Sequence, residues 1–258
     1  MRRFSTLAIV AAVLMGLVAP PVLSSEMLPL RPDLQTVQPK DFSIETYRGE
    51  RRLRFDNEVL NAGAGVLELY TTSTKCTTGK GASGRIAMQR LYSDDGSGIF
   101  ERETDTASTS QPAGCMTFHQ AHRHWHFDDF ALYEVFQLDA GVRGAQAAVS
   151  TKSTFCIIDI HRRTDLTGEL AGSPTEKYYR SCSRSSVQGL SIGWSDEYTS
   201  TLSDQYVVIT ALAAGTYCFV STADPRRVLA ETNDANNSAS VPIELLSDGT
   251  VLWGSGSC

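Results

Sequence analysis

Short runs of strand-forming residues, each ended by turn residues, recur through this 258-residue chain and limit the folds that it can adopt. Residues 53–60 and 66–72 alternate apolar and polar side chains on either side of a glycine-rich turn, and β-branched and aromatic residues gather at 155–158, 206–209 and 217–220. Such side chains fit the half-buried face of a pleated sheet. No segment has the long, capped apolar stripe that predicts a helix. The sequence therefore predicts an all-β fold with an antiparallel β-sandwich-like core.

Two polar segments interrupt these runs and are expected to form long irregular loops. Residues 74–114 are rich in Gly, Ser and Thr, and residues 161–190 are likewise polar and irregular. Loops of this length inside a compact domain are usually functional, and a disulfide can hold them. The sequence has no clear internal repeat, so we expect one domain.

The first 24 residues have the composition of a secretory signal peptide. Arg2 and Arg3 precede an apolar run from Leu7 to Val18, and small residues follow up to Ser24, after which cleavage is expected. The run is too short to span a bilayer, and an uncleaved membrane anchor is the alternative interpretation. No later stretch is apolar enough to be transmembrane. Residues 25–258 would then form a secreted, extracellular or periplasmic domain.

Six cysteines lie in this mature part, and an even number in an exported chain indicates disulfides, most simply three. They are Cys76, Cys115, Cys156, Cys182, Cys218 and Cys258. No pair has the C-x-x-C spacing, which disfavours a zinc ribbon or a thioredoxin-like dithiol. The sequence leaves the choice among the possible pairings open.

The acidic balance of charge argues against one class of partner. The formal net charge is −6, the isoelectric point is near 5.4, and loss of the signal peptide, with two arginines and no acid, makes the charge −8. Phosphate contacts need a surplus of Lys and Arg, so a general nucleic-acid binder is not expected. Cationic small molecules or basic polypeptides are electrostatically better partners.

Four of the five histidines lie within one eight-residue segment. On an extended strand, alternate side chains share a face, so His122, His124 and His126 would point one way, with neighbouring Cα atoms about 6.5–7 Å apart. Three imidazoles can bind one metal ion and leave positions open for other ligands. The alternative is a His-rich surface tract with incidental metal affinity, but the interleaved Trp125 and Phe127 favour a structured strand with one apolar face.

The other two histidines are expected to have lesser roles. His119 has the opposite parity on such a strand, so a structural or supporting role is expected rather than ligation. His161, alone in a polar segment, is expected at the surface. Three histidines do not identify the metal, and a zinc hydrolase, a copper redox enzyme and a metal-storage protein all stay open at this point.

The order of the remaining motifs resembles that of the lysyl oxidase family of secreted copper amine oxidases. The histidine array looks like the family's copper-binding segment, and two later stretches look like those that carry the cofactor lysine and the cofactor tyrosine. The matching stretches are Phe118–His126, Lys152–Asp159, Gln188–Ser191 with Asp196–Tyr198, and, toward the end of the chain, Gly215–Tyr217, Asp224–Pro225 and Glu231–Asn237. The resemblance covers roughly residues 28–245.

Carried over residue by residue, the resemblance implies copper on His122, His124 and His126 and a lysine tyrosylquinone cofactor built from Lys152 and Tyr198. It implies an oxidoreductase that converts a primary amine, either a peptidyl lysine of a polypeptide or a small amine, to an aldehyde. Molecular oxygen is the acceptor, and hydrogen peroxide and ammonia are released. Taken singly, an ordinary solvated lysine and a half-buried strand tyrosine are the alternatives for the two cofactor residues.

The chain also departs from the animal enzymes of this family. Ala121 stands where they have a cysteine directly before the first copper ligand, and the spacing from His126 to Phe130 is one residue shorter. The N-terminal half also lacks most of the cysteines of the animal enzymes, so a shorter, bacterial-type homologue is expected. The reaction also needs a positioned base, and the candidates near the motifs are Asp128, Asp129, Asp196 and Glu197.

The resemblance further implies a calcium site between an early Asp-Leu pair and the late acidic segment. Carboxylate, amide and backbone carbonyl oxygens suit a hard cation. The residues concerned are Asp33, Leu34, Glu231, Asp234, Asn236 and Asn237, with Asn233 at the position where the family pattern has an Asp. A polar turn between strands is the alternative interpretation.

Two other functions stay open alongside the amine oxidase. One is a non-catalytic secreted β-sandwich module for copper binding or adhesion, and the other is a zinc hydrolase that uses the three histidines. In a zinc hydrolase Lys152 and Tyr198 would be bystanders, and in the non-catalytic module copper would bind but no quinone would develop.

Overall fold

The structure is a computed structural model that describes residues 29–94, 96–150, 154–182, 187–202 and 204–258. The predicted signal peptide, residues 1–24, and Lys152 lie outside the described residues. The described chain folds into three antiparallel sheets and one short helix, α1 (Thr164–Thr167). The prediction of an all-β antiparallel fold is therefore confirmed.

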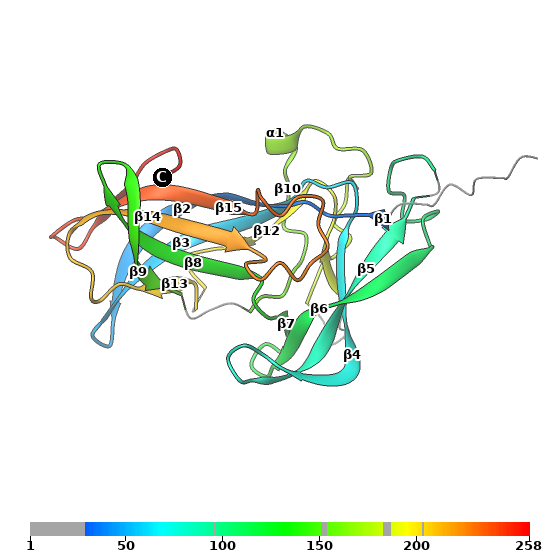
Figure 1. Cartoon of the computed structure of the whole chain (residues 1–258), viewed down its shortest axis with the longest axis horizontal. Helices are drawn as coiled ribbons and strands as arrows, with labels where there is room; N and C mark the ends of the chain where they lie inside the picture. Colours follow the sequence, from blue (N-terminus) through cyan, green and yellow to red (C-terminus); the bar gives the residue numbers. More distant parts are fainter. Residues whose placement is uncertain (1–28, 95, 151–153, 183–186, 203) are drawn as a thin grey trace, which may run out of the picture.

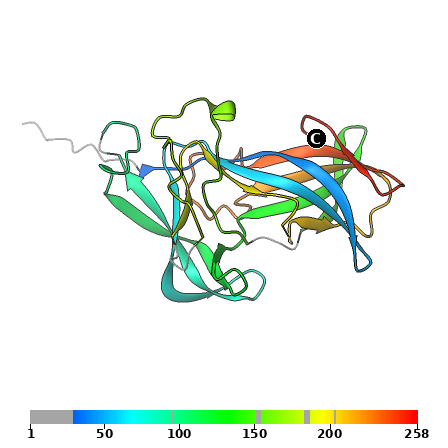
Figure 2. The ribbon, with the colours of Figure 1, turned by 180° about the vertical axis from the view of Figure 1, so that it is seen from behind.

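Two of the sheets face each other at one end of the molecule (Figure 1). One consists of β2 (Leu34–Tyr47), β3 (Glu50–Asn61), β10 (His161–Arg162), β12 (Trp194–Tyr198) and β13 (Tyr206–Val208). The other consists of β8 (Ala131–Asp139), β9 (Val142–Val149), β14 (Gly215–Ala223), β15 (Ser238–Leu245) and β16 (Val251–Trp253). Seen from behind, the long β2–β3 hairpin, in blue, curves along this sandwich (Figure 2).

Aromatic side chains fill the space between these two sheets. The Phe55 ring of β3 lies 4.7 Å from that of Tyr133 on β8 and 4.4 Å from that of Phe219 on β14, measured between centroids. All three side chains are fully buried. Burial of such large apolar groups is the main favourable contribution to folding, so this aromatic cluster holds the sandwich together.

The third sheet lies at the other end of the molecule and carries the histidine segment (Figure 1). Its strands are β1 (Pro29–Leu30), β4 (Leu67–Thr77), β5 (Ser83–Ser93), β6 (Ser108–His119), β7 (His124–Phe127) and β11 (Gln188–Leu190). Strand β7 is at the edge of this sheet and pairs with β6.

The expectation of a loop over residues 74–114 is wrong, because this segment holds the end of β4, all of β5 and much of β6. In strand β5 alternate residues from Ala87 to Leu91 are buried, but the middle one is Gln89. Its polar side chain interrupts the alternation of apolar and polar residues that predicts a strand. The Gln89 amide exchanges hydrogen bonds of 3.1 and 2.7 Å with the backbone of Ala230, which satisfies it inside the protein. The second polar segment, 161–190, is mostly irregular as expected, with only β10, α1 and β11 in its described part.

The cysteines form three disulfides, as predicted, and the structure supplies the pairing that the sequence left open. Cys76 is joined to Cys115, Cys156 to Cys182, and Cys218 to Cys258. The first joins β4 to β6, and the third attaches the last residue of the chain to β14. Among the described residues, no helix has the length and apolar character needed to cross a membrane.

Candidate metal centre

The β6–β7 hairpin gathers the four clustered histidines at one place. His119 ends β6 and is the ladder partner of His124, which begins β7. Residues 120–123 form the turn, where Arg123 adopts a positive φ of 62° and its backbone N–H donates to the His119 carbonyl at 2.7 Å. His122 therefore lies in a turn, and the prediction of one continuous strand through His122 and His126 is wrong in this respect.

The imidazole rings of this hairpin lie close to one another. His124 Nε2 is 3.0 Å from His126 Nε2. The His119 ring is stacked on that of His126 with centroids 4.9 Å apart, and its centroid lies 4.1 Å from that of His122. One ring nitrogen each from His119, His122 and His126 lie within 4.8 Å of one another. The structure thus brings together all three predicted ligands, and it adds His119, which parity on a single strand had set aside.

Burial and mutual repulsion favour neutral imidazoles here. His126 is buried, His119 and His124 are half-buried, and His122 is exposed. Burial lowers the pKa of His124, and the neighbouring His122 and His119 lower it further. Neutral imidazole is the form that binds metals. Several nitrogen donors within ligating distance of a common point fit copper or zinc, whereas calcium and magnesium need oxygen donors.

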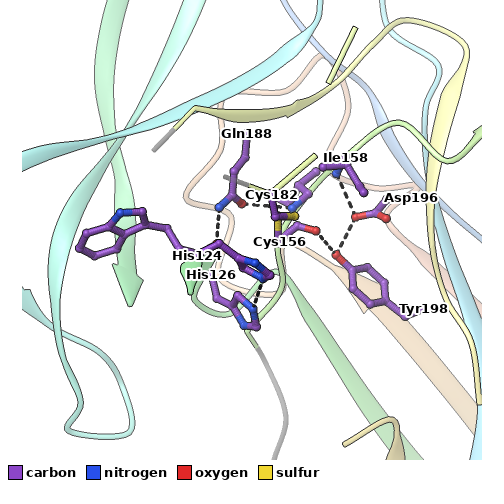
Figure 3. The surroundings of a disulfide bond; sticks show 10 residues. His124, His126, Cys156, Ile158, Cys182, Gln188, Asp196 and Tyr198 are labelled. Carbon is purple, nitrogen blue, oxygen red and sulfur yellow. Dashed lines mark hydrogen bonds between the residues drawn. A yellow bond between two sulfur atoms is a disulfide. The ribbon is translucent and has the colours of Figure 1, made fainter. Parts of the chain in front are cut away.

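A disulfide forms the wall beside His124 (Figure 3). The sulfur atoms of Cys156 and Cys182 lie within 4.8 Å of a His124 ring nitrogen, but they are bonded to each other and so are not thiolate ligands. Phe155, the residue before Cys156, exchanges backbone hydrogen bonds of 2.6 and 2.9 Å with Phe127, at the end of β7. The Cys156 segment is therefore fixed directly against the histidine hairpin.

Gln188 joins this segment to the hairpin from a third direction (Figure 3). Its amide nitrogen donates to the Trp125 carbonyl, and its amide oxygen accepts the Ile157 N–H at 3.1 Å. Gln188 is 2% exposed, so its hydrogen bonds act in a water-poor interior. The three motifs that were singled out in the sequence thus meet in space through Gln188.

Tyr198 lies on β12 with its hydroxyl in a polar, buried setting. The hydroxyl oxygen is 2.5 Å from the Cys156 carbonyl oxygen and 2.6 Å from Asp196 Oδ2. Its ring packs edge-on against Phe155 with centroids 4.3 Å apart. Burial and the nearby Asp196 raise the pKa of Tyr198 well above its usual value.

Asp196 is the candidate base that contacts Tyr198. It is 2% exposed, and burial raises its pKa well above the usual value, although the Tyr198 hydroxyl and the Ile158 N–H, 3.3 Å away, act in the opposite direction. The phenol has one proton for two acceptors, so a protonated Asp196 donating to the phenol satisfies both contacts.

The other candidate acids form ion pairs or lie in another cavity, although Glu197 lines the same cavity as Asp196. Asp129 pairs with Arg226 at 2.6 Å, and Glu197 pairs with Lys40 at 3.3 Å and with His161 at 2.9 Å. Asp128, though buried, lies beside Asp129 in a separate cavity with Cys76 and Cys115. His161 is exposed, as predicted.

The histidines, the disulfide and Tyr198 line one cavity of about 290 Å³. Its apolar wall is formed by Phe155, Ile158, Ile160 and Leu202, and Asp196, Glu197 and Asp204 contribute acidic groups. Thr154 also lines it and follows Lys152 by two residues in the sequence. Sequence reasoning had no signal for Ile160 or Leu202, because apolar residues in irregular segments carry no period.

The residues of the predicted calcium site form a second polar cluster. The Glu231 carboxylate accepts the Leu34 N–H at 2.7 Å and the Asn237 amide N–H at 2.8 Å. The Asn236 amide nitrogen donates to both carboxylate oxygens of Asp33, at 3.2 and 3.1 Å. These contacts connect the start of β2 to residues 231–237, near the end of the chain.

The chemistry of this cluster suits a hard cation. Burial raises the pKa of Glu231 to about 8, and the nearby acids Asp224 and Asp234 raise it as well. Among the described residues, the buried Oδ1 atoms of Asn236 and Asn237 have no hydrogen-bond partner. Asp234 itself is exposed. The cluster therefore holds carboxylate and amide oxygens that a cation would satisfy.

Comparison with known proteins gives one consistent match. The model of the family described as "Lysyl oxidase" matches residues 71–254. Lysyl oxidase homolog 2 of Xenopus tropicalis is 31% identical over 121 residues, which is 46% of this chain and 14% of that protein. Lysyl oxidase homolog 4 of Homo sapiens is 30% identical over 137 residues, which is 53% of this chain and 16% of that protein. The match thus spans about one sixth of the length of these curated relatives.

Proposed function

The chain belongs to the lysyl oxidase family, and we propose that it is a secreted copper-dependent amine oxidase. The reaction consumes a primary amine, O₂ and water and releases an aldehyde, ammonia and hydrogen peroxide. The observation that carries this proposal is the single cavity lined by the clustered histidines and by Tyr198. A metal that activates O₂ and a tyrosine that is to be oxidised must be close together, and the cavity provides that proximity.

The copper ligands in this proposal are His122, His124 and His126. The close approach of their rings and the lowered pKa of His124 support neutral nitrogen donors. Imidazole suits Cu(II), and the copper would supply the one-electron chemistry with O₂ that the protein's own side chains lack.

The cofactor in this proposal is lysine tyrosylquinone, formed when the Lys152 side-chain nitrogen bonds to the oxidised ring of Tyr198. When present, it supplies an electron-poor carbonyl carbon that a primary amine can attack. Support comes from Tyr198 itself, which lines the cavity, and from Thr154, which lines it two residues after Lys152 in sequence. Phe155 packs on the Tyr198 ring and restricts its orientation.

Asp196 is the residue best placed to handle protons. Its carboxyl contacts the Tyr198 hydroxyl at 2.6 Å and lines the same cavity. A base is most effective when its pKa is near the working pH, and burial raises the pKa of Asp196 in that direction. In this proposal the protonated form of Asp196 donates to the Tyr198 hydroxyl, and its ionised form takes the α-proton of the bound amine.

The shape of the cavity supports an aliphatic amine as substrate. Ile158, Ile160 and Leu202 form an apolar wall that fits an alkyl chain, while the histidines and Asp196 lie at the polar part. A peptidyl lysine or a small primary amine meets these demands. The three disulfides and the composition of residues 1–24 support secretion.

Mass analysis of copper-loaded protein incubated in air tests this function. We expect a covalent cross-link between the Lys152 and Tyr198 peptides, positive quinone staining, and peroxide release with an amine panel. Tyr198→Phe should remove all three. Separable Lys152 and Tyr198 peptides in active protein would contradict the cofactor. Copper binding without a quinone would indicate a non-catalytic module. Hydrolytic activity of the zinc-loaded protein that is retained in Tyr198→Phe would indicate a hydrolase.

A further inference from the structure

We propose that Leu202 is a specificity-determining residue for the amine substrate and that Arg54 is the positioning residue that holds it at the cavity. Leu202 would contact the alkyl chain of the amine and favour longer chains over shorter ones. This inference rests on the proposed amine oxidase function and names a determinant of its substrate class.

The chain between β12 and β13 leaves the sheet beside the cavity. The two strands pair end to end with β3, because Tyr198 of β12 is the partner of Asn57 and Tyr206 of β13 is the partner of Arg54. Between these two pairs β3 has two residues, whereas the opposing segment has seven, residues 199–205, which we call the excursion. Seven residues against two leave five additional ones, so the excursion acts as an enlarged β-bulge. Bulges are over-represented next to active sites, where they redirect side chains.

Arg54 holds the excursion through two backbone carbonyls. Its Nη1 atom donates to the carbonyl oxygens of Ser200 and Leu202, at 2.8 Å each, and its Nε atom donates to the Glu45 carboxylate at 2.7 Å. The neighbouring Asp56 carboxylate accepts the Ser200 N–H at 2.5 Å. A guanidinium presents its donors in a rigid fork. Arg54 therefore fixes the backbone from which the Leu202 side chain projects.

The excursion presents Leu202 to the cavity as an exposed apolar group. Leu202 lines the cavity and is 42% exposed, whereas Ile158 and Ile160 of the same apolar wall are half-buried. Removal of apolar surface from water is favourable and grows with the area that is covered. An alkyl chain in the cavity therefore gains most by covering Leu202, and a longer chain covers more of it than a shorter one.

Two pairs of matched variants test these roles. Leu202→Ala is compared with Leu166→Ala, because Leu166 on α1 is 51% exposed and lies outside the described residues that line the cavity. Arg54→Met, which keeps most of the apolar stem, is compared with Arg52→Met. Both arginine side chains are 15% exposed on β3, but Arg52 donates to Glu50 instead of the excursion. Circular dichroism shows whether each variant has folded.

The measurement is the ratio of kcat/KM for n-hexylamine to kcat/KM for ethylamine, taken from peroxide release by the copper-loaded full mature chain. We expect this ratio to fall about tenfold in Leu202→Ala, since apolar contacts of this size discriminate substrates by about that factor or more. Arg54→Met should lower it in the same direction, and the two control variants should keep the wild-type ratio. An unchanged ratio in Leu202→Ala, or an equal fall in Leu166→Ala, would overturn the inference.

The double variant Arg54→Met/Leu202→Ala tests whether Arg54 acts through Leu202. Two residues that act through one contact are not additive. We therefore expect the ratio in the double variant to equal that of Leu202→Ala. Additive losses would overturn the positioning role of Arg54.

Binding of the same two amines to the copper-free proteins, measured by isothermal titration calorimetry, distinguishes this inference from the proposed function. If the wild type prefers n-hexylamine and Leu202→Ala does not, while no peroxide is released, the role of Leu202 stands and the amine oxidase proposal fails. If the amines are oxidised with the same ratio by wild type and Leu202→Ala, the function stands and the role of Leu202 fails. A wild type that neither binds nor oxidises the amines contradicts both.

Discussion

At the scale of single residues, Asp196 is the most buried of the acids that line the histidine cavity. It is 2% exposed and touches the Tyr198 hydroxyl, and burial raises its pKa well above the usual value. The folded state therefore holds a proton on this carboxyl over a pH range in which the unfolded chain has lost it, above about pH 4. Two measurements follow from this setting.

The first measurement is the pH dependence of the stability of wild type and Asp196→Asn. The stability due to protonated Asp196 is complete below the unfolded pKa of about 3.9 and is lost as the pH rises toward the folded value. Asn does not titrate, and its amide can donate to the phenol as the protonated acid does. We therefore expect the free energy of unfolding of Asp196→Asn, relative to wild type, to increase as the pH rises above about 4. Urea unfolding at several pH values measures this, and a constant difference would contradict the raised pKa.

The second concerns catalysis. Asp196→Asn should lower kcat for amine oxidation by about 10²–10⁴-fold, the usual contribution of a positioned base. Peroxide release per quinone-containing molecule is the measurement, so that a failure to form the cofactor is not counted as slow turnover. Asp128→Asn is the matched control, because Asp128 is also buried but lies in another cavity. Equal losses in the two variants would contradict a specific role for Asp196.

At the residue scale, sequence motifs predicted the family, but the choice among candidate acids depended on contacts between residues far apart in the sequence. The order of the His, Lys152 and Tyr198 motifs was enough to identify the family. Four acids near these motifs were equivalent in sequence, and the choice of Asp196 needed the positions of Lys40, Arg226 and Tyr198. His119 was set aside because parity was counted along one strand, whereas a hairpin reverses the chain between His119 and His124.

At the scale of elements, strand β11 shows how closely the sheets approach the site. Gly189 of β11 lies between Gln188, which binds the Trp125 carbonyl, and Leu190. A Cβ at Gly189 would overlap the Leu67 carbonyl oxygen and come within 2.6 Å of the Tyr179 ring. Because Gly189 has no side chain, β11 can pair with β4 while lying directly against Tyr179.

Gly189→Ala should therefore destabilise the protein by about 3 kcal/mol or more, since the obstructing atoms include backbone that cannot rotate away. The matched control is Gly144→Ala on the exposed strand β9, where the new Cβ would be 3.5 Å from Gln137 Cβ, an ordinary contact. We expect the control to change stability by less than about 0.5 kcal/mol. Thermal and urea unfolding compare the two, and similar values would contradict the close approach at Gly189.

Element prediction failed where a polar residue took a core position. The alternation in β5 is regular in the structure, but Gln89 replaces an apolar residue and makes the segment look like a loop. The buried Gln89 amide is satisfied by hydrogen bonds to the backbone of Ala230, 141 residues away. No local sequence pattern predicts these bonds. By contrast, the runs 53–60 and 66–72 contain enough alternating apolar residues to be recognised as strands.

At the scale of the whole molecule, two of the disulfides have different positions relative to the cavity. Cys156–Cys182 closes a 26-residue separation and walls the cavity, whereas Cys218–Cys258 closes a 40-residue separation outside the residues that line it. Chain-entropy estimates give about 3.5–4 kcal/mol for loops of these sizes. We expect the paired Cys→Ser variants of either disulfide to lose similar stability. Only the Cys156/Cys182 variant should also lose quinone formation in copper-loaded protein, and quinone staining at a temperature where both are folded is the measurement.

The Glu231 cluster connects the start of β2 to residues 231–237, and we expect it to respond to calcium. At about 100 times Kd, Ca²⁺ would stabilise the folded state by about 2.7 kcal/mol. We expect calcium to raise Tm in the wild type and not in Glu231→Gln, which keeps the hydrogen-bonding shape but loses the charge. Glu244→Gln, on the exposed side of β15, is the control and should retain the shift. A shift of the same size in Glu231→Gln would place any calcium elsewhere.

Cys156 contributes two groups to the site: its sulfur lies in the cavity wall, and its carbonyl oxygen accepts the hydrogen bond of the Tyr198 hydroxyl. The shape of the site is thereby tied to the folding history of the chain. If the chain is exported as proposed, its cysteines would stay reduced in the cytoplasm, and the cavity wall formed by Cys156–Cys182 would be complete only after export. Under the proposed function, the order of maturation after export would be formation of the Cys156–Cys182 disulfide, then copper binding, then formation of the quinone at Tyr198. A trafficking defect would therefore produce the same inactive, colourless protein as a substitution of Tyr198.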